Sequence, residues 1–236
     1  MERRSPALFP ETPWTLILSS RDRTTARRTA LHELLVSYWK PLYFYVRRKG
    51  HSVESAEDVI QGLCVQLLEK DFLARLDPGR GRFRSYLRTA VDHYLVNMHE
   101  KDAAQKRGGG ARLVPLDVEL AETQIAAAPE SAEDAYDREW AAAVLARALT
   151  RLRRDFDAGG RKGSFDVAVR FFGFTEAPSY ADAARDAGMS VVQLKAFLHR
   201  TRERFRALVR EEVARTVPDP EDVDTEIAQL THVLRR

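Results

Sequence analysis

The sequence is poor in cysteine and contains no long hydrophobic run, and each of these absences excludes a class of protein. Its one cysteine, Cys64, cannot form an internal disulfide and lacks the cysteine and histidine neighbours of a metal site, so a buried apolar role is expected. No stretch reaches the roughly 18 apolar residues of a membrane-spanning helix, and the charged N-terminus has no apolar signal segment. We therefore expect a cytoplasmic protein with no membrane partner and no bound metal.

Groupings of residues that carry catalysis are also lacking. The six histidines are dispersed, and none has a recognisable acid or nucleophile partner in the sequence. No phosphate-binding loop or metal-ligand spacing is present. The sequence predicts a protein that is not an enzyme and that needs no cofactor.

The charges are segregated along the chain, although the net charge is only +3. Residues 80–112 hold eight basic and three acidic residues, and residues 194–210 hold six basic residues and one acidic residue. Between them, residues 113–139 hold eight acidic residues and one basic residue. The composition of each positive segment alone is more typical of a solvated helix face, with nucleic-acid binding as the alternative.

Apolar residues recur at three-and-four spacing over most of the chain, and no stretch of useful length alternates as a strand does. The clearest stripes predict helices over 31–45, 56–68, 83–98 and 135–156, and Pro41 is expected to kink or divide the first of them. Four more helices are expected: a short one that begins at Thr12-Pro13, a short one around 165–172, and two after it. The predicted fold class is all-α.

We expect two helical domains, residues 12–112 and 134–215, joined by an acidic linker at 113–133. The linker stretch loses the helical period, contains two prolines and gathers acidic residues, as an extended chain would. A C-terminal extension follows at 216–236 and ends in an amphipathic stretch. Two interpretations of this extension stay open: an extra regulatory helix, or a packed terminus.

Residues 180–199 fit the helix-turn-helix template place by place. The apolar places that hold the two helices together are occupied by Ala183, Ala187, Met189, Leu194 and Phe197. The small place where the helices cross is Ala184, and Gly188 stands where the turn needs a positive φ. Ser190 is expected to cap the second helix, from which four side chains point away from the packing face: Val191, Val192, Lys195 and His199. The template favours DNA binding over an ordinary helical hairpin.

Five arginines continue the second helix of this motif: Arg200, Arg202, Arg204, Arg206 and Arg210. Phosphate contacts are the natural use for such a series, because each neutralised phosphate releases counterions. A purely solubilising role is the alternative.

Together these features resemble bacterial RNA polymerase sigma factors of the extracytoplasmic-function class. The resemblance covers nearly the whole chain: a helical domain with an Asp-x-x-Gln motif, a basic aromatic helix, an acidic linker and a helix-turn-helix. It implies that core RNA polymerase and promoter DNA are partners. It also makes an anti-sigma factor a candidate third partner.

Residues 56–61 resemble the segment with which these sigma factors grip the clamp helices of the polymerase. Asp58 and Gln61 stand three residues apart and therefore share a helix face. The resemblance implies that these two residues and the neighbouring Glu57 contact core RNA polymerase. The sequence departs from the family at Cys64, where an aromatic residue is usual.

Residues 83–87, Phe-Arg-Ser-Tyr-Leu, are similar to the family's Phe-Arg-x-Trp-Leu, which opens the helix that engages the minus-ten promoter element. Tyr86 replaces the usual tryptophan, and its place on the apolar stripe favours a core role over base stacking. The implied contacts with melted DNA are the cationic and hydrogen-bonding side chains Arg84, Arg88, His93, Asn97, Lys101, Lys106 and Arg107.

Residues 177–210 are similar to the minus-thirty-five-binding domain of the same family. The resemblance implies contacts with that element by Ser190, Val191, Val192, Lys195, His199, Arg200 and Arg202. The first turn of the second helix is more apolar than the small or acidic residues often found there, so a different preferred promoter sequence is expected.

The function predicted is that of a sigma factor, which binds core RNA polymerase and directs promoter recognition and transcription initiation. A stand-alone helix-turn-helix transcriptional regulator is the main alternative, and it would bind its operator tightly without polymerase. A protein-interaction module whose helix-turn-helix has lost DNA contact is a third possibility. The arginine series argues against that third class.

Overall fold

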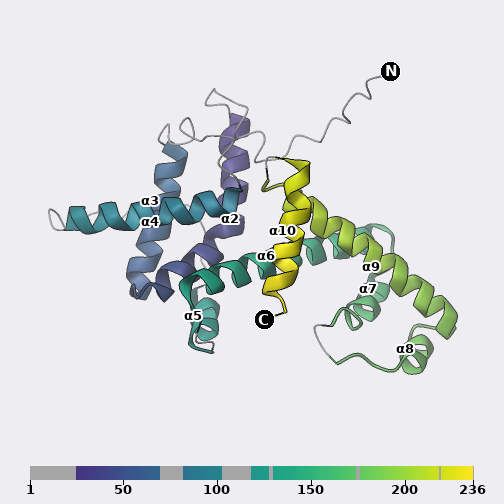
Figure 1. The fold of residues 1–236 in the computed structure, drawn as a ribbon. Coiled ribbons are helices and arrows are strands. Elements are labelled where there is room, and N and C mark those ends of the chain that lie inside the picture. The colour runs from purple at the N-terminus through teal and green to yellow at the C-terminus, as the bar shows by residue number, and fades with distance from the viewer. Residues whose placement is uncertain are drawn as a thin grey trace, which may run out of the picture. The chain divides into compact units, whose positions relative to one another are not determined.

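The computed structural model describes residues 25–69, 82–102, 118–127, 130–173, 176–217 and 219–235. The short helix expected to begin at Thr12-Pro13 lies outside these ranges. All regular structure in these ranges is helical and none of it is strand, which confirms the predicted all-α fold (Figure 1). The chain divides into two compact units. Unit 1 comprises the described residues up to Ala143 together with those from Val213 onward, and unit 2 comprises Val144–Glu212.

Helix α2 (Thr25–Arg48) is the centre of unit 1, and it is not divided at Pro41. Proline leaves one carbonyl of the preceding turn without its helical N–H, which weakens a helix at that point. Burial of the residues on both sides compensates, because Tyr38 and every residue from Leu42 to Val46 are almost completely enclosed. Of the two outcomes expected at Pro41, a kink or a division, the division does not occur.

Helix α3 (Val53–Glu69) packs closely against helix α4 (Phe83–Asp102). The contact has no room for a side chain at Gly62, since a Cβ atom there would lie 2.0 Å from the hydroxyl oxygen of Tyr94. The apolar stripe of α3, including Val59, Ile60 and Leu63, is fully buried, as the spacing predicted.

Cys64 lies in this stripe and is 1% exposed. Burial raises the pKa of its thiol to about 12. Since only the thiolate reacts with alkylating or disulfide reagents, the reactive fraction falls by roughly a thousandfold for a rise of three pKa units. We expect Ellman's reagent at pH 8 to label the unfolded chain rapidly and the native chain at least a hundredfold more slowly. Equal rates in the two states would contradict the buried, structural role of this cysteine.

Helix α5 (Val118–Ala127) lies inside the stretch expected to be an extended linker, so that expectation is wrong for residues 118–127. Glu122 attaches it to α2, accepting hydrogen bonds from the Tyr43 hydroxyl at 2.6 Å and from Arg47 Nε at 2.7 Å. Arg48 also donates to the carbonyl of Ile125 at 2.6 Å. Glu122, one of the acidic residues that suggested an extended linker, is instead paired with Arg47 of α2.

The Glu122 contact makes stability depend on pH. Hydrogen bonding to Arg47, and more weakly to Tyr43, lowers the pKa of this carboxyl. A carboxyl whose pKa is lower in the folded than in the unfolded chain stabilises the folded state. This contribution is complete when the pH is above the pKa in the unfolded chain, about 4.3, and it is lost as the pH falls through the pKa in the folded chain. We expect Glu122→Gln to reduce the free energy of unfolding at about pH 6, with a difference from wild type that shrinks toward about pH 3. A difference independent of pH in denaturant titrations would show that the ion pair contributes nothing.

Unit 1 also takes in helix α10 (Pro220–Val233) and the first part of helix α6 (Ala132–Ala158). Residues 134–143, expected in the second domain, pack with the first because Tyr136 and Trp140 are 1% exposed in its core. The predicted C-terminal extension belongs to the same unit. Asp219 caps α10 by accepting from the backbone N–H of Glu221, and Pro220 occupies its first turn.

Unit 2 contains the rest of α6, helix α7 (Lys162–Val169), helix α8 (Tyr180–Asp186) and the greater part of helix α9 (Val191–Ala214). Phe156 stands at the centre of its core. The ring centroid of Phe156 lies 6.0 Å from those of both Phe165 and Phe197, in edge-on arrangements. These aromatic contacts join α6 and α7 to α9, and so hold α9 in place within unit 2.

Candidate nucleic-acid interface

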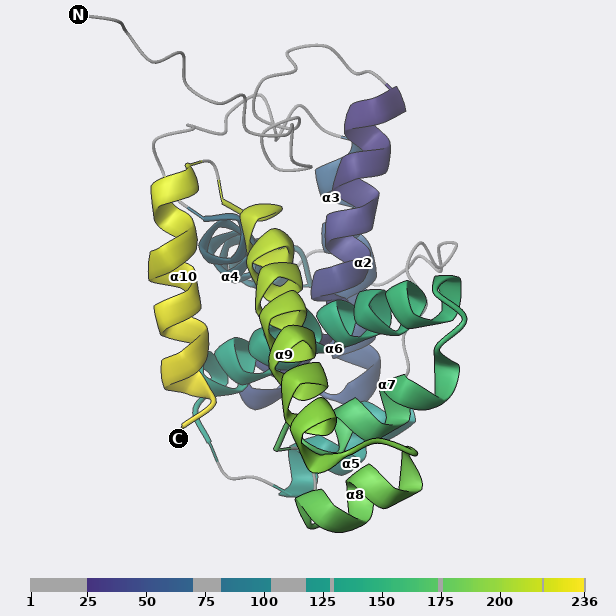
Figure 2. The same ribbon diagram turned by 90° about the vertical axis from the view of Figure 1, so that its right-hand side faces the viewer.

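Helices α8 and α9 form the predicted helix-turn-helix in unit 2, with α8 beside the N-terminal end of α9 (Figures 1 and 2). Ala183 and Ala184 are 1% and 2% exposed, which lets the two helices approach closely. The turn passes through Gly188 at a φ of +64°, a conformation that side chains with a Cβ rarely adopt. The structure thus confirms both the small crossing residue and the turn glycine.

The start of α9 is fixed by a reciprocal cap. Ser190 Oγ accepts from the backbone N–H of Gln193 at 3.2 Å, and Gln193 Oε1 accepts from the backbone N–H of Ser190 at 2.8 Å. This pattern satisfies two of the free N–H groups at a helix start. It confirms Ser190 as the cap and shows a role for Gln193 that the sequence prediction missed, although serine followed three residues later by glutamine is its sequence signature.

The predicted outward face of α9 is exposed. Val192 is 77% exposed and Val191 37%, and Lys195, His199 and Arg200 are exposed as well. Leu194 and Leu198, on the other side of the same helix, are 0% and 1% exposed. The helix therefore holds its apolar side in the core of unit 2 and presents a mixed apolar and cationic side to solvent. DNA contact by these residues stays a prediction.

Three of the arginines expected at phosphates have partners within the chain. Arg202 is half-buried and donates to the carbonyl of Phe171 at 2.9 Å. Arg204 pairs with Asp155 at 2.7 Å, and Arg206 pairs with Glu203 one turn back. Arg200 is exposed and makes no ion pair within the part of the chain that the structure describes. Arg200 is accordingly the best placed of these four for a phosphate.

The residues expected to contact core polymerase lie on α3. Asp58 is exposed, while Glu57 and Gln61 are half-buried on the same helix. Val59 and Ile60, on the opposite side of α3, are fully buried in the core of unit 1 and hold the helix in place. A carboxylate and an amide on a fixed helix face can pair with basic or polar side chains of a protein partner.

The residues expected at the minus-ten element differ in their surroundings. His93 and Asn97 are exposed on α4, and Arg88 is half-buried there. Lys101 lies in the last turn of α4, whereas Lys106 and Arg107 lie outside the described residues. Tyr86 is half-buried and stacks on Phe83 with 6.4 Å between ring centroids, as expected for a core role.

Arg84 is not available to DNA in this structure, so its prediction as a minus-ten contact is contradicted. It is 8% exposed, and its Nε donates to Glu226 of α10 at 2.8 Å while Nη1 pairs with Asp137 of α6. Its guanidinium lies 4.5 Å from the ring centroid of Trp140. Arg84 was expected at the surface because nothing near it in the sequence indicates its two carboxylate partners. Those partners come from segments far away in the sequence.

Glu226 is the most enclosed charged group of this cluster, at 1% exposure, and it also pairs with Arg82. The hydroxyl of Tyr136 donates to the backbone carbonyl of Arg84 at 2.8 Å, and the backbone N–H of Phe83 donates to the carbonyl of Thr216 at 3.1 Å. The start of α4 is thus bound by hydrogen bonds to α6 and to the chain just before α10.

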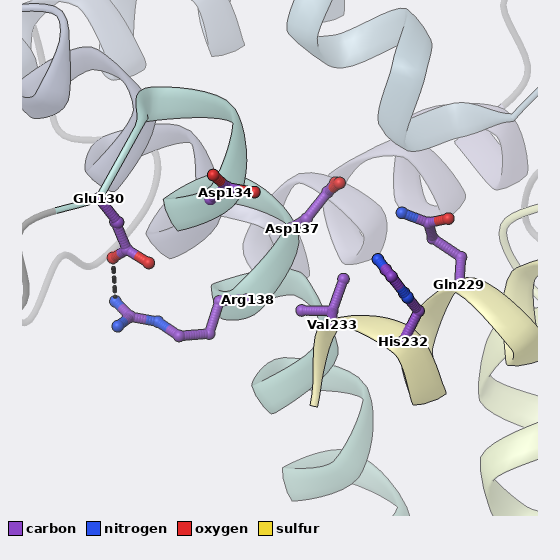
Figure 3. A pocket seen from close by; sticks show the side chains of 7 residues that line it. All are labelled: Glu130, Asp134, Asp137, Arg138, Gln229, His232 and Val233. Carbon is purple, nitrogen blue, oxygen red and sulfur yellow. Dashed lines mark ion pairs between the residues drawn. The ribbon is translucent and has the colours of Figure 1, made fainter. Parts of the chain in front are cut away.

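A groove of about 430 Å³ lies between α6 and α10 in unit 1 (Figure 3). Arg138 and Glu130, on the side formed by α6 and the residues just before it, form an ion pair at 2.8 Å, and His232 and Gln229 line the side formed by α10. Within the described ranges, no group of three or more potential ligands could hold a metal ion. None of the residues predicted to contact polymerase or DNA lines this groove.

In a comparison with protein families, residues 34–105 match the model of Sigma-70 region 2. The match runs from Leu34, within α2, past the end of α4 and covers less than one third of the chain. It supports a sigma factor, with a role in promoter recognition together with RNA polymerase, and region 2 implies binding to the core enzyme. No curated protein and no solved structure matches the chain. Of the helices described, none is both long enough and apolar enough to cross a membrane.

Proposed function

We propose that the protein is a sigma factor of the extracytoplasmic-function class, with promoter recognition divided between its two units. Unit 1 binds core RNA polymerase through Glu57, Asp58 and Gln61 of α3 and engages the minus-ten element through α4. Unit 2 reads the minus-thirty-five element through α9. The observation that carries the proposal is a complete helix-turn-helix with an exposed outer face, on the same chain as a region 2 match but in a separate unit.

Within α4, the exposed His93 and Asn97 are the side chains best placed to hydrogen-bond an unstacked base. Arg88, Lys101, Lys106 and Arg107 supply positive charge along and beyond the helix. Arg84 is excluded from this set by its two carboxylate partners.

The test is run-off transcription with purified chain and core RNA polymerase across a library of genomic fragments. The expected result is co-elution of the chain with core enzyme and discrete transcripts from a few fragments. Neither co-elution nor a specific transcript would reject the proposal. Tight binding to duplex fragments without polymerase would instead identify a stand-alone helix-turn-helix regulator.

The division of labour gives a prediction for Arg200. Arg200→Ala is expected to weaken binding of the holoenzyme to duplex DNA carrying the upstream element, because it removes an exposed cation that makes no ion pair among the described residues. The slope of log affinity against log salt is expected to fall by about 0.9, the value for one phosphate contact. Lys195→Ala is expected to weaken the same binding.

Glu203→Ala, on the same helix, is the control for replacing an exposed charged side chain by alanine, and it should not weaken binding. Co-elution with core enzyme should be unchanged in all three variants. Loss of core binding in both Arg200→Ala and Lys195→Ala would contradict the assignment of the two functions to different units.

A further inference from the structure

The first turn of α9 exposes apolar side chains that its own unit does not cover. Six large hydrophobic residues are exposed among those described, and three of them belong to the helix-turn-helix: Tyr180, Val191 and Val192. Val192 is the most exposed of the six, at 77%. Scattered apolar residues on a surface are ordinary, but adjacent ones at the start of the helix expected to enter a groove call for an apolar partner.

The side-chain amide oxygen of Gln193, in this first turn, already accepts a hydrogen bond within the helix cap. A glutamine on a recognition helix can read adenine through paired hydrogen bonds. Here Gln193 Oε1 accepts from the backbone N–H of Ser190 at 2.8 Å, so its amide closes the helix cap. Releasing it to a base gives up a capping interaction worth about 1 kcal/mol. The acceptor that paired hydrogen bonds with adenine need is therefore occupied, and the methyl groups of Val191 and Val192 are the exposed apolar surface of the first turn.

Positive charge borders the apolar turn. Lys195 Nζ lies 5.4 Å from the ring centroid of Tyr180, and that ring stacks on Phe171 with 5.1 Å between centroids. The cation is therefore placed one turn beyond the valines, and Arg200 follows on the exposed side of the helix. Exposed apolar side chains followed along the helix by exposed cations suit a DNA groove, in which phosphates flank the base edges.

We propose that Val191 and Val192 read thymine through its 5-methyl group in the major groove of the upstream promoter element, with Val192 as the main contact. The inference rests on the proposed function and specifies what its recognition helix reads. The 5-methyl group of thymine is the apolar feature that distinguishes it on the major-groove edge. Branched aliphatic side chains make van der Waals contact with a methyl group and offer no hydrogen bond to any other base.

The test replaces thymine by deoxyuridine, one position at a time, in the upstream element of a promoter found by run-off transcription. This exchange removes the methyl group and leaves every hydrogen-bonding group in place. Holoenzyme is expected to bind about fourfold more weakly at one or two positions, which corresponds to about 0.8 kcal/mol for one buried methyl group. Val192→Ala is expected to weaken binding to the thymine duplex and to abolish the difference between the two bases.

Val36→Ala is the matched control, since Val36 is also an exposed valine, at 37%, and lies on α2 of unit 1. It should leave the response to deoxyuridine unchanged. Specific transcription with no effect of deoxyuridine at any upstream position would overturn the inference and leave the proposed function standing. Weaker binding of Val192→Ala to core enzyme, again without a deoxyuridine effect, would identify the valines as a protein contact and overturn it too. Absence of any specific transcript would overturn both.

Discussion

Glu226→Ala is expected to reduce the free energy of unfolding of unit 1 by about 3–5 kcal/mol, the usual cost of removing one partner from a buried ion pair. Glu226 is 1% exposed and pairs with both Arg82 and Arg84. Arg84 is itself 8% exposed, so its guanidinium would keep only Asp137 as a counter-charge. Denaturant unfolding followed by tryptophan fluorescence measures the effect in unit 1, because all three tryptophans precede residue 144.

The matched control is Glu203→Ala. Glu203 also pairs with an arginine, Arg206, but both side chains are more than half exposed. An exposed pair of this kind contributes about 0–1 kcal/mol, so the control should be nearly as stable as the wild type. Glu226→Gln should fall between the two, since an amide oxygen still accepts hydrogen bonds from arginine. A loss below about 1 kcal/mol for Glu226→Ala would show that the cluster is not tightly packed.

Features that depend on nearby residues could be predicted from the sequence. The helix-turn-helix is specified within about twenty residues. Each of its constraints is local: a small residue at Ala184, a glycine at the turn, and a serine with a glutamine three places on. The structure has Gly188 at φ +64° and the Ser190–Gln193 cap for that reason. The apolar stripes of α2 and α3 are buried as their spacing predicted.

Features that depend on distant partners could not be predicted in this way. Glu122 lies in the stretch expected to be an extended linker, and Glu226 lies in the C-terminal extension. Their arginine partners stand 75 and 142 positions away in the sequence. Arg84 was expected at DNA because its local motif resembles a DNA-binding one, and nothing near it in sequence indicates the two carboxylates that enclose it. Composition reports the sign of a charge but not whether a partner neutralises it.

The predicted boundary between the two domains differs from the observed one for a related reason. Helix α6 runs without interruption from Ala132 to Ala158, while the boundary between the two units falls after Ala143. The helical spacing of apolar residues predicts that one face of a helix is buried, but it does not identify the domain core in which that face is buried. Tyr136 and Trp140 continue the stripe that includes Val144 and Leu152, yet they belong to unit 1. The functional assignment of the two domains stays a proposal.

Ending the chain at Val217 is expected to destabilise unit 1 further than Glu226→Ala does. The truncation removes Glu226 together with Val223 and Leu230, which are 3% and 5% exposed on α10. Burial of each such aliphatic side chain contributes about 1.5–3 kcal/mol in addition to the ion pair. Hydrogen exchange is the measurement, and amides of α4 should lose protection while those of α8, in unit 2, keep theirs.

The last helix of the sequence would then be a structural part of the unit formed by the first helices. A synthetic peptide of residues 218–236 is the direct complement to this truncation. Added in excess, it should restore protection to α4, because binding to the native state alone shifts the folding equilibrium toward that state. The same peptide carrying Glu226→Ala should restore less, since Arg82 and Arg84 would still lack their shared carboxylate. Unchanged protection of α4 after truncation would mean that α2 to α6 hold the start of α4 in place without α10.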